Sequence, residues 1–177
     1  MSEEVIHVLQ HYRHDLMNRL QVVQGYLSMG KTEKAEEKLY EVLNFYNEER
    51  KLMSLNVPAF MLWILEFNSN FENFRLTYKI HAEYKNVHIS DSILVEQCRE
   101  IMEFCIKELD PLVLYQVFLE LKEVPNKPIM KVVLFINGDK EMDGLVIEEM
   151  KNKFVNKEID IDRTIDGLII GFSVPCQ

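Results

Sequence analysis

The sequence predicts an α+β protein in which a helical hairpin precedes a sheet covered by helices. Apolar residues recur at helical spacing through the first 55 residues, whereas several segments after Pro58 alternate between apolar and polar residues, as strands do. The chain has 177 residues, of which 47% are hydrophobic and 28% charged, and this is the composition of a globular protein. We therefore predict a hairpin domain over residues 1–56 and an α+β domain over residues 57–177.

The first predicted helix carries one apolar stripe, and a second helix follows after a very short connection. The stripe residues are spaced by threes and fours: Val5, Leu9, Tyr12, Leu16, Leu20, Val23 and Leu27. Gly30 is placed to end this helix and Thr32 to cap the next one. The apolar positions of the second helix are Ala35, Leu39, Val42, Tyr46 and Met53. The short "MGKT" connection makes the two helices an antiparallel hairpin.

A lone hairpin of this kind leaves part of each apolar stripe exposed to water. Two hairpins packed together form a four-helix bundle that covers both stripes. The pattern therefore predicts a homodimer that assembles through the hairpin. In the alternative arrangement, the hairpin packs on the C-terminal half of its own chain.

The second half of the chain is predicted to hold three helices and five strands. The helices are expected at residues 58–71, 90–109 and 142–154, and the strands at 75–84, 114–122, 129–136, 158–165 and 166–174. Ser90 or Ser92 should cap the second of these helices, and a turn at Asp166 and Gly167 should join the last two strands. This order predicts an α/β sandwich with helices against a mostly antiparallel sheet.

Composition also excludes several classes of function. The formal net charge is −9 and no basic patch is visible, which argues against a nucleic-acid-binding protein. The acidic N-terminus "MSEEVIHVLQ" has the features of neither a signal peptide nor a transit peptide. No apolar run approaches the roughly 20 residues that cross a bilayer, so we expect a soluble, cytoplasmic protein without membrane contact. The three cysteines are an odd number, and Cys98 and Cys105 are expected to be buried free thiols.

One residue of the first helix does not follow its apolar stripe. At 100° per residue, His14 points roughly 160° away from the mean direction of the stripe, and Asn18 and Gln21 share its side. The helix should therefore hold the imidazole of His14 in water. Three interpretations remain open, namely a surface histidine without a task, a metal site that includes His7 and His11, and a reactive group.

The residues beside His14 favour the interpretation as a reactive group. A water-exposed imidazole is partly neutral near pH 7, and neutral imidazole is a competent nucleophile. Asp15 can favour one tautomer or accept a proton, and Arg13 places a positive charge near an incoming phosphoryl group. Asn18 lies one helical turn further on and can donate a hydrogen bond. A nucleophile on a protruding helix could reach an active site held by another protein.

The segment "RHDLMNRLQVVQGYLSMGK" resembles the phosphoacceptor helix of the sporulation initiation phosphotransferases, which are the B components of the sporulation phosphorelay of spore-forming bacilli. The residues that match the motif of this family are Arg13, His14, Asp15, Met17, Asn18, Arg19, Leu20, Gln21 and Gly25. The resemblance is dense over about twenty residues and extends further as the order of elements, a hairpin followed by an α+β domain. It implies a dimeric four-helix bundle and a second domain similar to the ATP-binding domain of histidine kinases, but inactive as such.

The resemblance also implies a phosphorelay reaction. His14 would accept a phosphoryl group from the aspartate of a single-domain response regulator and pass it to the aspartate of a response-regulator transcription factor. Arg13, Asp15 and Asn18 would support the transfer. Arg19 and Gln21 would contact the partner regulators. No cofactor or metal is expected in this chain, because the Mg²⁺ of the reaction would belong to the regulator.

The sequence separately argues against a working histidine kinase. Such an enzyme needs glycine-rich loops around the nucleotide phosphates and an Asn-bearing helix for Mg²⁺. This chain has six glycines, none of them in a G-x-G arrangement, and the helix "EQCREIMEFCIKEL" contains no Asn. A degenerate histidine kinase and a non-catalytic dimeric scaffold remain alternatives to the phosphotransferase.

Overall fold

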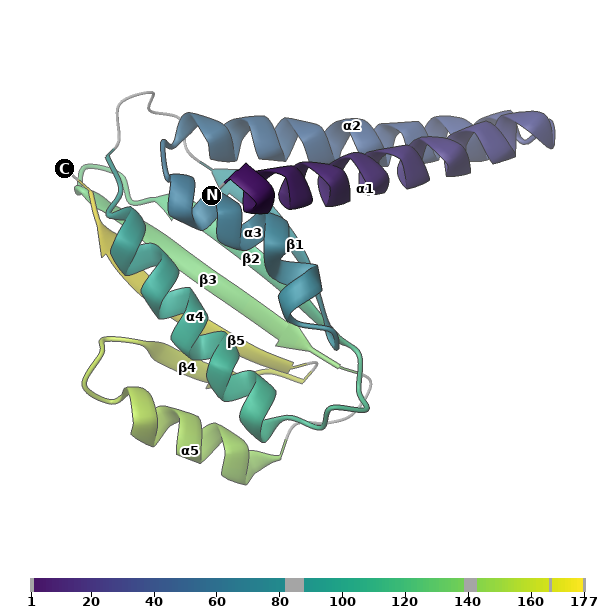
Figure 1. Cartoon of the computed structure of the whole chain (residues 1–177). Helices are drawn as coiled ribbons and strands as arrows, with labels where there is room; N and C mark the ends of the chain where they lie inside the picture. Colours follow the sequence, from purple (N-terminus) through teal and green to yellow (C-terminus); the bar gives the residue numbers. More distant parts are fainter. Residues whose placement is uncertain (1, 82–87, 139–142, 166, 177) are drawn as a thin grey trace. The chain divides into compact units, whose positions relative to one another are not determined.

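The computed structural model describes residues 2–81, 88–138, 143–165 and 167–176, and the side chains of residues 2–5, His7 and His11 are outside this description. Contacts divide the chain into two compact units, Met1–Arg50 and Lys51–Gln177. The second helix of the hairpin continues past this boundary to Ser54, and Leu52 near its end is part of the core of the second unit. Figure 1 shows the elements of both units.

The first unit is the predicted hairpin. Helix α1 spans Ser2–Ser28 and helix α2 spans Thr32–Ser54, and the two run side by side in opposite directions (Figure 1). Gly30 has a φ of 69°, in the left-handed region that favours glycine, and the amide of Lys31 donates a hydrogen bond to the carbonyl of Tyr26 at 2.9 Å. The predicted role of Gly30 as a helix-ending residue is confirmed. Thr32 is the first residue of α2.

Only part of the predicted apolar stripes is buried between α1 and α2. Val23 of α1 and Ala35 and Val42 of α2 are buried. In contrast, Leu9, Leu20 and Leu27 of α1 are 59%, 39% and 55% exposed, and Leu39 and Leu43 of α2 are 42% and 53% exposed. We call these five residues the hairpin apolar face.

The two rows of this face point to the same side of the hairpin. On α1, the row of Leu20 is turned by about 70° from the line of contact with α2, and on α2 the row of Leu39 and Leu43 is turned by about 100° from the line of contact with α1. On each helix the rotation from the contact line to the row has the same sense as the winding of the chain from N- to C-terminus. The two helices run in opposite directions, so seen from one end of the hairpin one rotation is clockwise and the other is anticlockwise. Both rows therefore lie on the same side of the hairpin.

The second unit is a five-stranded sheet with three helices. In chain order it contains α3 (Pro58–Asn70), β1 (Phe74–His81), α4 (Asp91–Glu108), β2 (Tyr115–Glu123), β3 (Ile129–Asn137), α5 (Gly144–Phe154), β4 (Asp160–Arg163) and β5 (Gly167–Pro175). The strand order is β1-β2-β3-β5-β4; β1 and β2 are parallel and the other neighbours are antiparallel. The predicted α+β class and the mostly antiparallel sheet are confirmed.

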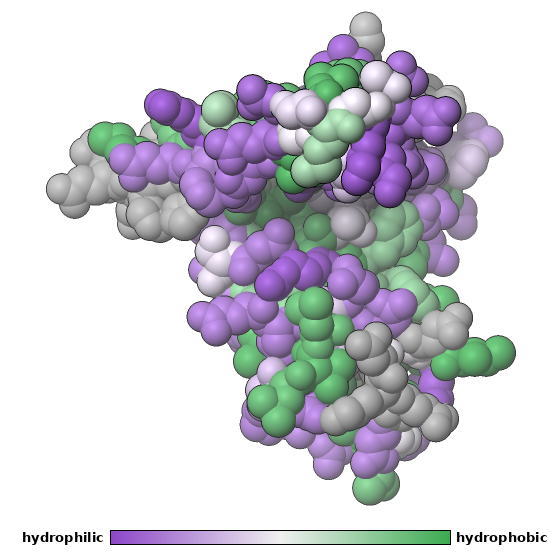
Figure 2. Space-filling model, turned by 90° about the vertical axis from the view of Figure 1, so that its right-hand side faces the viewer, coloured by the Kyte–Doolittle hydropathy of each residue, from purple (hydrophilic) through white to green (hydrophobic). Residues whose placement is uncertain are grey.

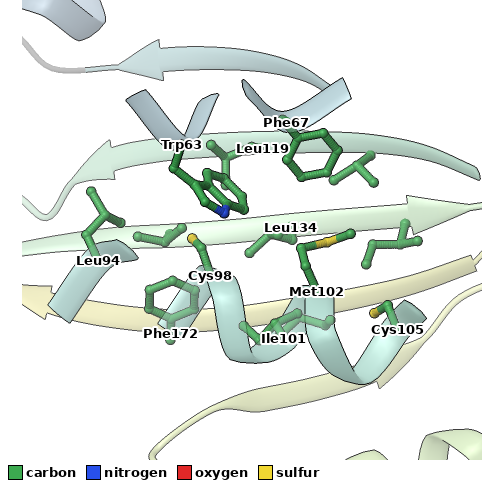
Figure 3. Close-up of a cluster of buried hydrophobic side chains, with 14 of the residues drawn as sticks. Trp63, Phe67, Leu94, Cys98, Ile101, Met102, Cys105, Leu119, Leu134 and Phe172 are labelled. Atoms are coloured by element: carbon green, nitrogen blue, oxygen red, sulfur yellow. The ribbon is translucent and has the colours of Figure 1, made fainter. Parts of the chain in front are cut away.

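The helices lie on one face of this sheet, where they enclose a continuous apolar core (Figures 1 and 3). Figure 3 shows Trp63 and Phe67 of α3 and Cys98 and Met102 of α4 above the inward side chains of the strands. Leu134 of the central strand β3 is fully buried among them. The alternation of apolar and polar residues along β2 and β3 produces this one-sided core.

A carboxylate joins two of these helices. Asp91, the first residue of α4, accepts hydrogen bonds from the backbone amides of Ala59 and Phe60 at 2.8 and 2.9 Å. These amides belong to the first turn of α3, which has no intrahelical partners for them. Ser90 lies at the N-cap of α4 as predicted, but its side chain makes no capping hydrogen bond.

Parts of three predicted elements lie outside the described residues: the end of the strand at 82–84, the helix start at Met142 and the turn residue Asp166. Hydrophobic side chains also reach the surface outside the core, and Figure 2 shows them as separate patches among hydrophilic residues on one face. Among the helices within the described ranges, none is long and apolar enough to cross a membrane.

Candidate phosphoacceptor site on helix α1

Helix α1 holds the side chain of His14 in water, as its spacing predicts. The side chain is 70% exposed, and its position on the helix is roughly opposite the residues that contact α2. An α-helix fixes this direction because the backbone of each turn is hydrogen-bonded to the next. The imidazole is therefore presented on a regular helix and open to approach by another protein.

Two side chains contact the ring of His14. The amide nitrogen Nδ2 of Asn18 lies 3.1 Å from Nδ1 and 3.5 Å from Nε2 of the imidazole. Oδ1 of Asp15 lies 3.6 Å from Nδ1, and its side chain is 69% exposed. Both neighbours therefore lie closest to Nδ1, while Nε2 is the ring nitrogen further along the side chain. The structure brings His14, Asp15 and Asn18 together as the sequence predicts.

The remaining predicted site residues are arranged differently from one another. Gln21 is exposed about 20° around the helix from His14, so it shares the same surface. Arg13 is exposed but points about 100° away from His14, toward the hairpin apolar face. Arg19 is half-buried with its guanidinium 4.1 Å from the centre of the Phe45 ring, so it packs against α2. The partner-contacting roles of Arg19 and Gln21 remain predictions.

A buried polar pair supports the helix beneath this site. The hydroxyl of Tyr12 donates a hydrogen bond to Oε1 of Glu49 at 2.8 Å, and the ring of Tyr46 packs edge-on against Tyr12 with centroids 6.1 Å apart. Burial and the neighbouring carboxylate of Glu49 raise the pKa of Tyr12. The Tyr12–Glu49 pair thus connects α1 to α2 about half a turn from His14, on the opposite side of α1.

Sequence analysis missed this pair, although a signal for it exists. Glu49 is only 5% exposed, and its second oxygen Oε2 has no hydrogen-bond partner among the described residues. The positions of Ala35, Val42 and Glu49 are separated by seven residues and therefore fall on one helix face. The predicted stripe instead followed apolar residue types alone and passed through Tyr46 and Met53, of which Met53 is 62% exposed.

The buried thiols and the metal-ligating residues that the structure describes form no second candidate site. Burial raises the pKa of the thiols of Cys98 and Cys105, the latter to about 12, so both stay protonated in the core at neutral pH. Their predicted state as buried free thiols is confirmed. The part of the chain that the structure describes contains no cluster of metal-ligating residues. The alternative metal site at His7 and His11 involves side chains outside the described residues.

The helical hairpin matches a domain of a known family. Residues 1–55 match the alpha-helical domain of SpoOB-type sensor kinases. The chain is also 33% identical over 101 residues to sporulation initiation phosphotransferase B of Bacillus subtilis (strain 168), and the alignment covers 57% of this chain and 53% of that protein. The chain thus spans about half the length of this relative. These matches confirm the resemblance that the residues around His14 indicate.

Comparison of the fold gives matches among histidine kinases. The catalytic domain of histidine kinase ThkA, in a nucleotide-free form, matches with a TM-score of 0.48 and 10% identity over 69% of this chain and 92% of that one. ThkA in complex with response regulator protein TrrA matches with a TM-score of 0.45 and 10% identity over 98% of this chain and 63% of that one. The histidine kinase AdeS of Acinetobacter baumannii matches with a TM-score of 0.35 and 13% identity.

Proposed function

We propose that this chain is a cytoplasmic phosphotransferase that moves a phosphoryl group between the aspartates of two response regulators through a phosphohistidine at His14. The observation that carries the proposal is the imidazole of His14, exposed on a helix and contacted through Nδ1 by Asn18 and Asp15. The similarity to sporulation initiation phosphotransferase B supports the reaction class. The donor would be a single-domain regulator and the acceptor a regulator that controls transcription.

The contacts of His14 favour Nε2 as the attacking nitrogen. An acceptor near Nδ1 stabilises the tautomer that carries the proton there, and the carboxylate of Asp15 is such an acceptor at 3.6 Å. The structure places the amide nitrogen of Asn18, a donor, 3.1 Å from Nδ1, and a half-turn about the last bond of this side chain would present its oxygen to Nδ1 as an acceptor. With the proton on Nδ1, the lone pair that attacks is on Nε2, which has the amide nitrogen of Asn18 at 3.5 Å.

The transfer itself would be an in-line displacement. Nε2 attacks the phosphorus of the regulator's aspartyl phosphate, an N–P bond forms, and the P–O bond to the carboxyl group breaks with its electron pair on the leaving carboxylate. The positive charge of the phosphorylated ring is stabilised by Asp15, which retains its contact at Nδ1. The second transfer is the reverse step with another aspartate as nucleophile. This chain would supply a positioned nucleophile, while the regulator supplies Mg²⁺.

The same proposal includes a homodimer. The hairpin apolar face exposes five large apolar side chains on one side of α1 and α2. A second hairpin against this side would form a four-helix bundle and remove these side chains from water. His14 points away from this side, so the bundle would leave the imidazole exposed.

The test is transfer of label from a phosphorylated regulator. A single-domain response regulator, labelled on its aspartate with radioactive acetyl phosphate, is mixed with the purified full chain and Mg²⁺. We expect label on the chain that is stable in base and labile in acid, as phosphohistidine is. His14→Gln should abolish this label and keep the fold, because a water-facing side chain is exchanged. His88→Gln is the matched control, since His88 is also exposed and should not affect labelling.

Three outcomes would contradict the proposal in different ways. Label that persists in His14→Gln would place the phosphoryl group on another residue. A regulator that binds without transferring label would indicate a scaffold. Label that the chain takes directly from radioactive ATP, without a regulator, would indicate a degenerate histidine kinase.

A further inference from the structure

An apolar row crosses the central strands on the face of the sheet opposite α3, α4 and α5. In the strand register, Phe118 of β2 pairs with Phe135 of β3, and Phe135 pairs with Ile169 of β5. Side chains directly opposite one another on neighbouring strands share a face of the sheet. Phe118 is 36% exposed, and Phe135 and Ile169 are partly exposed. Val133 extends the same surface by one residue pair along β3.

This row does not belong to the core of the unit. The residues that make up the core lie on the opposite face of the same strands, for example Val117 and Leu134. The partly buried residues that pack against the core do not include Phe118, Phe135 or Ile169. Within the described part of the second unit, the helices α3, α4 and α5 all lie on the core face (Figure 1).

A glycine beside this row has no role that its own chain explains. Gly171 lies in the middle of β5, opposite Val133, where glycine weakens a strand. A Cβ built on Gly171 would come no closer than 4.0 Å to any atom, so the fold itself leaves room for a side chain. Gly167 differs, because a Cβ there would lie 2.2 Å from the carbonyl oxygen of Ile136. Gly171 is buried by its neighbours in the sheet, and the absence of a side chain there is compatible with the close approach of another surface.

We propose that a second copy of this chain docks on this face, related by a two-fold axis that runs along β3. β3 is the middle strand of five, so this axis places β2 of one copy on β5 of the other and β1 on β4. Phe118 then meets Ile169 of the partner subunit, which opposes two apolar side chains, and Glu120 meets Gly171 of the partner subunit, which opposes a large residue to a small one. Phe135 meets its own counterpart on the axis.

The charges at the two edges of the face are complementary under the same axis. β1 presents Lys79 and β4 presents Asp160, and the register places both in the row of Val133 and Gly171. In the proposed dimer each Lys79 faces Asp160 of the partner subunit, twice by symmetry. Lys131 lies at one end of the axis, where the two copies bring like charges together. This repulsion limits the affinity without changing the alignment.

The size of the face sets the expected strength. Five strands about 4.8 Å apart, with about four outward residues each, form a platform of roughly 25 by 25 Å. Two such platforms bury on the order of 1,200 Å² in total, which is the lower end of specific interfaces. The sheet interface should therefore be weaker than a four-helix bundle, and it goes beyond the proposed phosphotransferase reaction.

The test is a cross-link of about 10 Å that only the proposed alignment allows, because sheets packed face to face lie about 10 Å apart and are too distant for a direct disulfide. Within one chain, Lys79 and Asp160 lie on opposite edges of the sheet, about 19 Å apart, so cysteines at these positions are beyond the reach of such a linker. We expect the full-length double variant Lys79→Cys, Asp160→Cys to form a covalent dimer with a bismaleimide that spans about 10 Å. The single variants should not, because each cysteine would lie far from its own counterpart.

Further substitutions connect this cross-link to the face itself. Adding Gly171→Val or Phe135→Lys to the double variant should lower the cross-linked fraction at least about tenfold, with unchanged circular dichroism. Leu145→Lys is the matched control, because Leu145 is 72% exposed on α5 and away from the face. Cross-linking no higher than in the single variants, or unaffected by Gly171→Val and Phe135→Lys, would overturn the proposal. Phosphoryl uptake by His14 should be normal in all these variants, so the two proposals fail separately.

Discussion

The two units of the chain treat their apolar residues in opposite ways. The sheet unit encloses the apolar residues on the face that its helices cover, where Leu119 and Leu134 are fully buried between the strands and three helices. The hairpin leaves Leu20 and Leu27 39% and 55% exposed, although both follow a regular helical stripe. Two helices form a single layer, and one layer has no second surface against which to bury a stripe. The comparison teaches that an apolar stripe on a helix predicts a surface that another element covers, and that this element can belong to a second chain.

This difference has a thermodynamic consequence. The sheet unit should be stabilised by its own core, independently of protein concentration. The hairpin should gain further stability when a partner covers its apolar face, so its stability should increase with concentration by mass action. Substitutions in the two units should therefore affect different observables, and the following predictions test that separation.

The largest effect is expected from Leu134→Asp in the core of the sheet unit. A carboxylate without a partner in this fully buried position costs several kcal/mol, which is comparable to the whole stability of a typical domain. We expect loss of the cooperative thermal transition of the sheet unit at every protein concentration, followed by circular dichroism. Leu134→Met is the conservative control and should retain the transition. A folded Leu134→Asp protein would show that the core is misassigned.

Leu20→Asp should have the next largest effect, on assembly and not on the sheet unit. Leu20 belongs to the hairpin apolar face, and a buried carboxylate there would prevent a bundle from forming. We expect association through the hairpin to be lost in analytical ultracentrifugation, with the thermal transition of the sheet unit retained. Val22→Asp is the matched control, because Val22 is 45% exposed on the same helix but points to the other side of the hairpin. Unchanged assembly in Leu20→Asp would remove the hairpin apolar face as the dimer interface.

Much of the fold could be predicted from local patterns. The hairpin follows from helical periodicity and the break at Gly30, and the strands β2 and β3 follow from alternation, because each pattern reflects which side of an element is buried. Contacts between distant segments could not be predicted in this way. The hydrogen bonds from the amides of Ala59 and Phe60 to Asp91 join residues about thirty positions apart and leave no periodic signal. The same holds for the order of the strands.

The same difference between local patterns and contacts of distant segments applies to the candidate site. His14, Asp15 and Asn18 are close in sequence on one helix, so helix geometry alone brings them together. The Tyr12–Glu49 pair depends on how two helices are aligned, and only the structure shows it. For Arg19 the structure shows packing on Phe45 within the chain, and the contact with a partner that the resemblance implies stays a prediction.

Asn18→Ala and Asp15→Ala should slow phosphoryl transfer without abolishing it. Neither side chain forms the covalent bond, and support of a tautomer or a proton is typically worth about 10²–10⁴ in rate. Arg13 points toward the hairpin apolar face and not along His14, so Arg13→Ala should act on the encounter with the regulator through longer-range charge attraction, more visibly at low salt, where exposed charges are less screened. Rates of transfer measured against regulator concentration separate these effects. Wild-type rates in all three variants would mean that His14 works without its neighbours.

The smallest effect is expected from Tyr12→Phe, which tests a single contact between the two helices of the hairpin. Losing the hydroxyl leaves Glu49 without its hydrogen bond at Oε1 and should cost about 1 kcal/mol near pH 7.

The sign of the pH dependence follows from the raised pKa of Tyr12, which burial and the hydrogen bond to Glu49 produce. A group whose pKa is raised on folding contributes stability below its unfolded pKa, here about 10, and loses that contribution as the pH rises further. Thermal melting at fixed protein concentration should therefore show a difference between wild type and Tyr12→Phe at pH 7 that shrinks above pH 10. Tyr40→Phe, on an exposed tyrosine outside the contact between the helices, should show no difference at either pH, and an equal loss in both variants would assign the effect to tyrosine content and not to the Tyr12–Glu49 pair.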